Sequence, residues 1–392
     1  MEQPLNLLWL LLPVAAVMGW WLGRIPSNGA HRESAGDGLR SDYFRGINYL
    51  LNEQPDKAIE VFIKVLEVDQ ETVETHLALG NLYRRRGEVD RAIRIHQNLV
   101  ARTSLTADQR SEALLELGQD YLSAGLLDRA EDLFKELAHT NHYRVQALRQ
   151  LIDIYEQERD WDEAIECARQ LEKDTGNQLG AVIAHYHCEQ AERMRQAGDT
   201  TGALKLVGQA LDMHRACVRA SLLEGDIHAS NGEHERAVRA YQRVEDQDPA
   251  YLPEIIEPIQ RCFDELGRTQ ETRAYLLRLL ERYGWVSAAL ELAEIERISD
   301  GPRAAIDFIS EQLRNRSSVR GLDRLMELES EERGEQVPEY FRLLKGLTAE
   351  LLEDRAVYKC SHCGFPARSM HWKCPSCKHW NTVKPIQGVD GE

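Results

Sequence analysis

The sequence has little proline and none of the common enzyme motifs. Proline accounts for 12 of the 392 residues and charged residues for 29%, a composition typical of an ordered, helical protein rather than a disordered one. The chain has no phosphate-binding loop, no Gly-x-Ser-x-Gly, no His-Glu-x-x-His and no dinucleotide-binding fingerprint. We therefore expect a protein that is not an enzyme.

Basic residues are outnumbered by acidic ones. The chain has 48 Lys and Arg against 65 Asp and Glu, for a net charge of −17. The acidic excess lies in residues 41–354, because residues 355–389 contain six basic residues and no acidic one. An acidic surface repels the phosphate backbone, so no nucleic-acid partner is expected for the body of the chain.

The chain also lacks a cysteine spacing that suggests a disulfide framework. Four of its eight cysteines are scattered through predicted helices: Cys167, Cys188, Cys217 and Cys262. The other four are paired near the C-terminus. In a long helical chain this pattern favours a reducing compartment.

One stretch near the N-terminus has no charge at all. Leu5–Leu22 contains 18 uncharged residues, just enough to span a bilayer. A buried core helix and a cleaved signal peptide are the alternatives, but only Glu2 precedes the run and no small-x-small cleavage site follows it. The run ends at Trp20 and Trp21, and indoles favour the membrane interface. Residues 1–24 are therefore predicted to be a transmembrane anchor.

The flanking charges predict the orientation of this anchor. Arg24 lies directly after the apolar run, and no Arg or Lys precedes it. The positive-inside rule then places the N-terminus outside and the rest of the chain in the cytoplasm. Residues 25–40 are rich in turn residues and are expected to be a linker.

A repeated unit organises most of the remaining chain. In Thr75–Ala101, small, aromatic and turn residues have the spacing of two short helices in a hairpin: Gly80, Tyr83, Gly87, Ala92 and Leu99. The glycine at 80 is predicted to lie where the two helices cross, and the glycine at 87 in the turn. Asp90 is predicted to cap the second helix.

The same pair of positions, twelve residues apart and small except at Ile152, recurs along the chain. The pairs are Gly46/Ala58, Gly80/Ala92, Gly118/Ala130, Ile152/Ala164, Ala191/Ala203 and Gly225/Ala237. Successive pairs are separated by 34, 38, 34, 39 and 34 residues, and a period of 34 resembles the tetratricopeptide repeat family. Residues 41–354 are therefore predicted to form an all-α tetratricopeptide superhelix of eight or nine hairpins, the last of them divergent.

The C-terminal cysteines have the spacing of a metal site. Tyr358–Trp380 contains two Cys-x-x-Cys pairs separated by ten residues: Cys360, Cys363, Cys374 and Cys377. Each pair can form a tight turn that presents two thiolates, so that the two turns supply a tetrahedral site. The stretch resembles a rubredoxin-like zinc ribbon, although Lys378 stands where a glycine is usual.

Four thiolates close the coordination sphere, so we expect one structural metal ion, iron or zinc, rather than a catalytic one. The module is assigned to residues 355–384 and the tail to residues 385–392. Three histidines flank the cysteines but are not needed as ligands: His362, His371 and His379.

The basic residues of this module suggest two alternative roles. They are Arg355, Lys359, Arg368, Lys373, Lys378 and Lys384. We favour docking of the module on the acidic repeats, with Trp372 and Trp380 as anchors of that contact. A nucleic-acid-binding ribbon is the alternative.

The combination of anchor, repeats and four-cysteine module resembles the lipopolysaccharide assembly protein B family of Gram-negative bacteria, and the resemblance covers the whole chain. It implies a single-pass inner-membrane protein with a periplasmic N-terminus that regulates lipopolysaccharide synthesis. The implied partners are the membrane protease FtsH, the lipid A deacetylase that it degrades and other lipopolysaccharide assembly proteins, with a homo-oligomer possible. The residues alone support only a membrane-tethered scaffold, and a redox protein or a nucleic-acid-binding protein remains an alternative.

Overall fold

The computed structural model describes residues 42–52, 54–68, 72–140, 142–353, 355–389 and 391. The predicted anchor, residues 1–24, and the predicted linker, residues 25–40, lie outside this part of the chain. Among the described residues, no helix combines the length and the apolar character needed to cross a bilayer. The chain divides into two compact units, Met1–Ile154 and Tyr155–Glu392.

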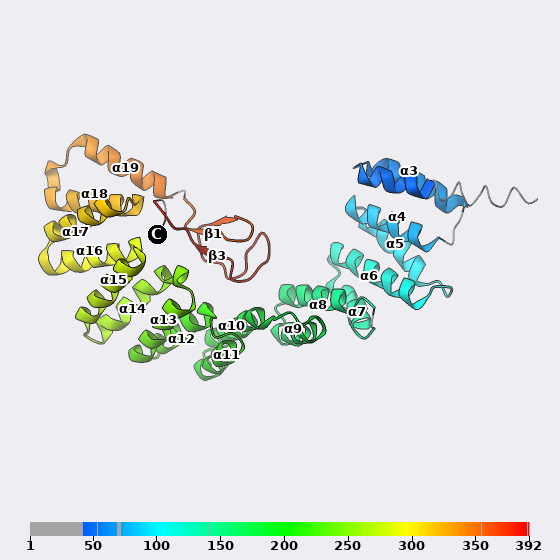
Figure 1. The fold of residues 1–392 in the computed structure, drawn as a ribbon, viewed down its shortest axis with the longest axis horizontal. Helices are drawn as coiled ribbons and strands as arrows, with labels where there is room; N and C mark the ends of the chain where they lie inside the picture. The colour runs from blue at the N-terminus through cyan, green and yellow to red at the C-terminus, as the bar shows by residue number, and fades with distance from the viewer. Residues whose placement is uncertain are drawn as a thin grey trace, which may run out of the picture. The chain divides into compact units, whose positions relative to one another are not determined.

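The first unit consists of helical hairpins (Figure 1). A helix over residues 42–51 precedes the others. These are α3 (Pro55–Val68), α4 (Val73–Arg85), α5 (Val89–Val100), α6 (Ala107–Ser123) and α7 (Leu127–Ala138), followed by α8 (Arg144–Glu158), which continues into the second unit. The order and length of these helices agree with the predicted repeat.

Glycine permits close helix crossings because a ring from the second helix takes the space of its missing side chain. A Cβ atom added to Gly118 would lie 2.7 Å from Phe134, and one added to Gly80 would lie 2.3 Å from His96. Such contacts are far below the van der Waals distance, so a larger residue would force the helices apart. The prediction that Gly80 lies at a helix crossing is confirmed.

The turn glycine is also confirmed, but the predicted cap is not. Gly87 has φ +79°, a left-handed conformation that costs glycine little. Helix α5 begins at Val89, and its N-cap residue is Glu88. The prediction that Asp90 caps α5 is therefore wrong: Asp90 lies inside the first turn, where its charge favours the helix through the dipole.

The second unit continues the same pattern. Its helices are α9 (Trp161–Thr175), α10 (Gly180–Gln196), α11 (Thr200–Met213), α12 (Val218–Ser230), α13 (His234–Gln247), α14 (Pro253–Glu265), α15 (Thr269–Tyr283), α16 (Val286–Asp300), α17 (Pro302–Asn315), α18 (Val319–Arg333) and α19 (Glu339–Glu353), with short 3₁₀ turns η2 (Pro249–Tyr251) and η3 (Gly334–Gln336). Gly225 packs on Tyr241 as Gly118 does on Phe134, and Gly267 makes the turn before α15 with φ +69°.

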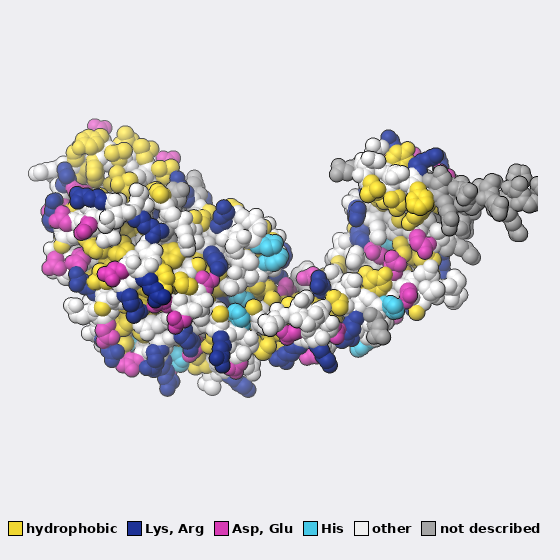
Figure 2. Space-filling model, viewed as in Figure 1, with side chains coloured by type: hydrophobic (Ala, Val, Ile, Leu, Met, Phe, Trp, Pro, Cys, Tyr) yellow, Lys and Arg dark blue, Asp and Glu magenta, His cyan; other side chains and the backbone are white. Residues whose placement is uncertain are grey.

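The last helix differs from the others because no described hairpin stacks beyond it. Large apolar side chains of α19 are exposed on one face, as the hydrophobic surface over this helix shows (Figure 2): Tyr340, Leu343, Leu344, Leu347 and Leu351. Terminal repeats lose one neighbour, so their sequence pattern weakens. This explains why the sequence pattern is weakest in the last predicted hairpins.

A small antiparallel sheet follows α19. It has the strand order β2-β1-β3 and comprises β1 (Tyr358–Cys360), β2 (Pro366–Ala367) and β3 (Val383–Pro385). Lys359 pairs with Pro366 on one side and with Lys384 on the other. The sheet holds the first cysteine pair in place, and the ribbon lies on the inner side of the arc that α10 to α18 trace (Figure 1).

Candidate metal centre and its seat on the repeats

Two turns of the same construction present the four cysteines. In the first, the amide of Gly364 donates to the carbonyl of Cys360 over 2.9 Å, and in the second the amide of Lys378 donates to that of Cys374 over the same distance. Gly364 has φ +79° and Lys378 φ +61°. The second turn therefore keeps its shape although lysine replaces the usual glycine.

The four sulfur atoms lie close together, at a spacing that suits a tetrahedral site. The Sγ atoms of Cys360 and Cys377 are 3.8 Å apart, those of Cys363 and Cys374 are 3.7 Å apart, and all four lie within 4.8 Å of one another. Zinc–sulfur bonds of about 2.3 Å in a tetrahedron require sulfur–sulfur edges of about 3.8 Å. A disulfide requires about 2.05 Å. The spacing thus fits a tetrathiolate metal ion and not a disulfide, and the metal itself stays a prediction.

The surroundings of the sulfurs act in opposite directions on two of the four cysteines. Burial opposes ionisation of Cys360, but the Thr382 hydroxyl and the amides of Cys363 and His362 outweigh it and lower the pKa of Cys360 to about 5. The amide of His379 acts on Cys377 in the same sense, but burial and the three other sulfurs raise the pKa of Cys377 to about 12. Four thiolates cannot share this space without a cation, which is the condition that a bound metal satisfies.

Lys378 offers a direct test of backbone strain in the second turn. A non-glycine residue in the left-handed region costs about 1–2 kcal/mol. Lys378→Gly is therefore expected to stabilise the metal-loaded ribbon by about 0.5–1 kcal/mol, after the added chain entropy of glycine. Metal competition with a chelator measures this change. The matched variant Gly364→Ala should weaken binding by a similar amount, and equal behaviour of the two variants would contradict the strain argument.

Glu156 is the main polar anchor of the ribbon. Its side chain is 7% exposed and forms a salt bridge with Lys373. The indole Nε1 of Trp380 donates to the same carboxylate over 2.8 Å, and the hydroxyl of Tyr186 donates to it over 2.7 Å. One carboxylate near the end of α8 therefore binds two ribbon residues and one residue of α10.

Aromatic rings form the apolar part of the contact. The ring of Trp380 is stacked 5.1 Å from that of His185, and the ring of Trp372 is stacked 5.5 Å from that of Tyr251. The guanidinium of Arg219 lies 6.0 Å from the Trp372 ring. Burial, together with the charge of Arg219, lowers the pKa of His185 to about 3. The His185 imidazole is therefore neutral when it packs on tryptophan. The prediction that both tryptophans anchor the ribbon on the repeats is confirmed.

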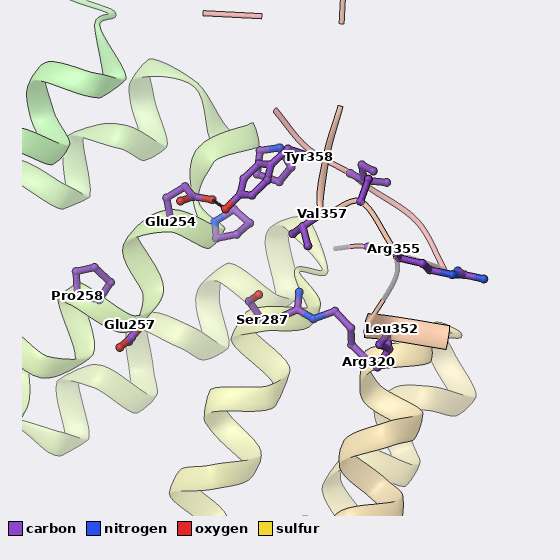
Figure 3. Close-up of a pocket in the computed structure, with 14 residues that line it drawn as sticks. Glu254, Glu257, Pro258, Ser287, Arg320, Leu352, Arg355, Val357 and Tyr358 are labelled. Atoms are coloured by element: carbon purple, nitrogen blue, oxygen red, sulfur yellow. Dashed lines mark hydrogen bonds between the residues drawn. The ribbon is translucent and has the colours of Figure 1, made fainter. Parts of the chain in front are cut away.

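Further contacts secure the strands. The Tyr251 hydroxyl donates to Asn381 over 2.9 Å, and Lys384 Nζ lies 2.7 Å from an Asp248 carboxylate oxygen. The Tyr358 hydroxyl donates to Glu254 over 2.9 Å (Figure 3). This bond borders a cavity of about 370 Å³ between the ribbon and the helices. The central strand β1 and the edge strand β3 are thus tied to the repeats.

These contacts also bear on the alternative of nucleic-acid binding. Lys373 and Lys384 are paired with carboxylates of the repeats, and Trp372 and Trp380 are covered by His185 and Tyr251. The predicted docking therefore takes up two of the six cations, and both tryptophan rings, that a nucleic-acid surface would use. The sequence did not identify Glu156, Tyr251 and His185 as residues that contact the ribbon. Nothing in the local sequence of an acidic or aromatic residue indicates a contact with a residue more than a hundred positions away.

The family models and curated relatives agree with this architecture. A model described as a rubredoxin metal binding domain matches residues 358–385, and tetratricopeptide repeat models match residues 75–110, 115–178 and 188–251. Lipopolysaccharide assembly protein B of Escherichia coli strain K12 is 40% identical over 99% of this chain and all of the relative. The protein of the same name from Haemophilus influenzae strain Rd is 32% identical over 98% of this chain and 99% of the relative.

The fold and the cysteine site define a tetratricopeptide repeat protein with a C-terminal rubredoxin-like ribbon. Similarity to the curated relatives extends over nearly the whole of both chains and is well above the level that fold alone produces. The chain belongs to the lipopolysaccharide assembly protein B family.

Proposed function

We propose that this protein is an inner-membrane-anchored scaffold in lipopolysaccharide assembly. The observation that carries the proposal is the full-length relationship to proteins named lipopolysaccharide assembly protein B. The architecture supports a role as a scaffold because stacked hairpins present extended surfaces to other proteins. The scaffold would bring the lipid A deacetylase to the membrane protease FtsH and so limit the supply of lipopolysaccharide.

The metal ion has a structural role in this proposal. Cys360, Cys363, Cys374 and Cys377 would hold one zinc or iron ion, which leaves no coordination position for a substrate. The ribbon is short and has only three brief strands, so it depends on the metal for its fold. A folded ribbon then braces α8 to α14 through Glu156, Tyr251 and the two tryptophans.

We assign partner binding chiefly to the hairpins of the first unit. In the second unit the ribbon occupies the inner side of the helices, where an extended ligand would otherwise bind. It contacts residues of α8, α10, α12 and η2. A partner segment there would have to displace Trp372 and Trp380. The first unit has the same hairpins, and the ribbon contacts described above all lie on the second unit.

The anchor gives this scaffold its effect on proteolysis. Residues 1–24 would hold the chain beside a membrane protease, with the N-terminus in the periplasm and the repeats in the cytoplasm. A tether turns the second encounter into an intramolecular one and strengthens capture by about a hundredfold or more without any new contact.

Reconstituted proteolysis tests this role. FtsH, the deacetylase and the full-length chain are combined in lipid vesicles, and loss of the deacetylase is followed over time. We expect the full chain to accelerate degradation by about tenfold or more, and a chain without residues 1–24 to bind the deacetylase with little acceleration. Equal acceleration by the anchored and truncated chains would contradict the tether, and no acceleration by either would contradict the scaffold.

A redox role is the second candidate, because the tetrahedral thiolate site suits iron as well as zinc. An iron-loaded chain would be coloured, and its visible absorbance would bleach with dithionite and recover in air. A colourless chain with one zinc ion would contradict this second candidate and leave the scaffold proposal intact.

A further inference from the structure

Two buried cysteines outside the metal centre lie against each other in the second unit. Cys188 is in α10, and Cys217 is the N-cap residue of α12. Their Sγ atoms are 3.9 Å apart, although 29 residues separate them along the chain. Cys188 is completely buried, and Cys217 is 3% exposed. Their side chains meet across the packing of two helices, so they form a pair of thiols and not two isolated ones.

The two thiols differ in acidity. The contact with Cys188 and the amides of Ala220 and Arg219 lower the pKa of Cys217, although burial opposes this. The same sulfur contact and burial raise the pKa of Cys188 well above its usual value. A thiol at a helix N-terminus next to an arginine is the more nucleophilic partner of such a pair, and the second thiol is placed to resolve a mixed disulfide.

The ribbon lies directly over the neighbours of this pair. The Trp372 ring is stacked on Tyr251 and lies against the guanidinium of Arg219, two residues after Cys217. Arg219 and Tyr251 are both close enough to Cys217 to interact with its charge. His185, one helical turn before Cys188, contacts Trp372 and Trp380. A reagent could therefore reach the two sulfurs from the side of the ribbon only after the ribbon has separated from the repeats.

We propose that Cys188 and Cys217 are a redox modification site, which forms an intramolecular disulfide when the ribbon separates from the repeats. The oxidant is a low-molecular-weight disulfide such as oxidised glutathione. The Cys217 thiolate attacks one sulfur of that reagent and releases one reduced thiol. Cys188 then gives up its proton and attacks the Cys217 sulfur, which releases the second reduced thiol. The two cysteines lose two electrons and two protons, and the reagent gains both.

Oxidation of the two cysteines would in turn disturb the contacts that hold the ribbon on the repeats. The two sulfurs must approach from 3.9 Å to about 2.05 Å, which draws α10 toward the start of α12. His185 and Arg219 move with these segments, and both contact Trp372. The disulfide therefore forms after the ribbon has separated from the repeats, and it opposes renewed docking until a reductant breaks the bond.

The test uses the metal-loaded, full-length chain and its Glu156→Ala variant, in which the ribbon loses its main polar anchor. Each is incubated with oxidised glutathione, and the linked Cys188 and Cys217 peptides are quantified by mass spectrometry without reduction. We expect the linked peptide to form about tenfold or more faster in Glu156→Ala than in the wild type, since access is limited by local opening. Dithiothreitol should remove it, and Cys188→Ala should leave Cys217 as a glutathione adduct.

Cys262 serves as an internal control, because it is 2% exposed and lies outside the pair. The rate at which Cys262 reacts with oxidised glutathione therefore measures general opening of the helices. Glu166→Ala, which removes an exposed carboxylate of α9, should behave as the wild type. The proposal is overturned if no linked peptide forms in Glu156→Ala, if wild type and Glu156→Ala form it at the same rate, or if Cys262 reacts as fast as the pair. Should Glu156→Ala fail to fold, Trp380→Ala takes its place with the same criteria.

Discussion

Replacing Cys374 with serine is expected to abolish stable metal binding and to unfold the ribbon while the helical repeats remain folded. Cys374 is completely buried, and its Sγ lies 3.7 Å from that of Cys363. Three thiolates leave an open coordination position, and structural zinc contributes about 10–16 kcal/mol to the folding of small modules. Elemental analysis should show the metal content fall from about one ion per chain to near zero. Hydrogen exchange should show the largest loss of protection in residues 358–385, a smaller loss at the repeat residues that the ribbon contacts, and little change in the helices of the first unit.

The matched control for this experiment is Cys262→Ser. Cys262 is also buried, at 2% exposure, but it lies in α14 and outside the metal centre. This variant should lose some stability of the helices and keep its metal. A Cys374→Ser chain that still holds one metal ion and an ordered ribbon would show that the four-thiolate site has been assigned wrongly.

Glu156→Ala is expected to release the metal-loaded ribbon from the repeats without unfolding it. The change removes the carboxylate that binds Lys373 and accepts from Trp380 and Tyr186. Breaking a buried ion pair costs about 3–5 kcal/mol, and we expect the lower end because Lys373 stays partly exposed. Exchange of the backbone amides at the contact, around Tyr251 on the repeats and around Trp380 on the ribbon, should accelerate by about a hundredfold.

Two comparisons separate docking from general stability. Glu166→Ala removes an exposed carboxylate and should leave ribbon exchange unchanged. Glu156→Gln keeps an acceptor for Trp380 and should have an intermediate effect, because only the charge opposite Lys373 is lost. If Glu156→Ala left ribbon exchange at the wild-type rate, the docking contacts described here would not determine the position of the ribbon.

The sequence was most informative where a local pattern determines the structure. The repeat spacing predicts Gly80 and Gly118 as crossing residues, and the structure supplies the reason, because only a missing side chain admits His96 and Phe134 so closely. The four cysteines were identified by their spacing, since a Cys-x-x-Cys turn brings two sulfurs to one side whatever lies around it.

Long-range contacts could not be derived in the same way. Glu156 looks like any acidic residue of a solvated helix, and its role depends on Lys373 and Trp380, which are more than 200 residues away along the chain. The sequence indicated which residues of the ribbon would dock, because tryptophans and lysines gather there, but not the residues that receive them. Asp90 was assigned wrongly because an acidic residue near a helix start fits both a cap and the first turn, and only the backbone of Glu88 and Val89 distinguishes them.

The half-life of the lipid A deacetylase in living cells tests the central claim most directly. Synthesis is blocked in cells that contain the protein and in cells depleted of it, and the deacetylase is followed by immunoblot. A scaffold that delivers the deacetylase to FtsH predicts a half-life that is several times longer after depletion, restored by the full chain and not by a chain that lacks residues 1–24. An unchanged half-life after depletion would contradict the proposed role.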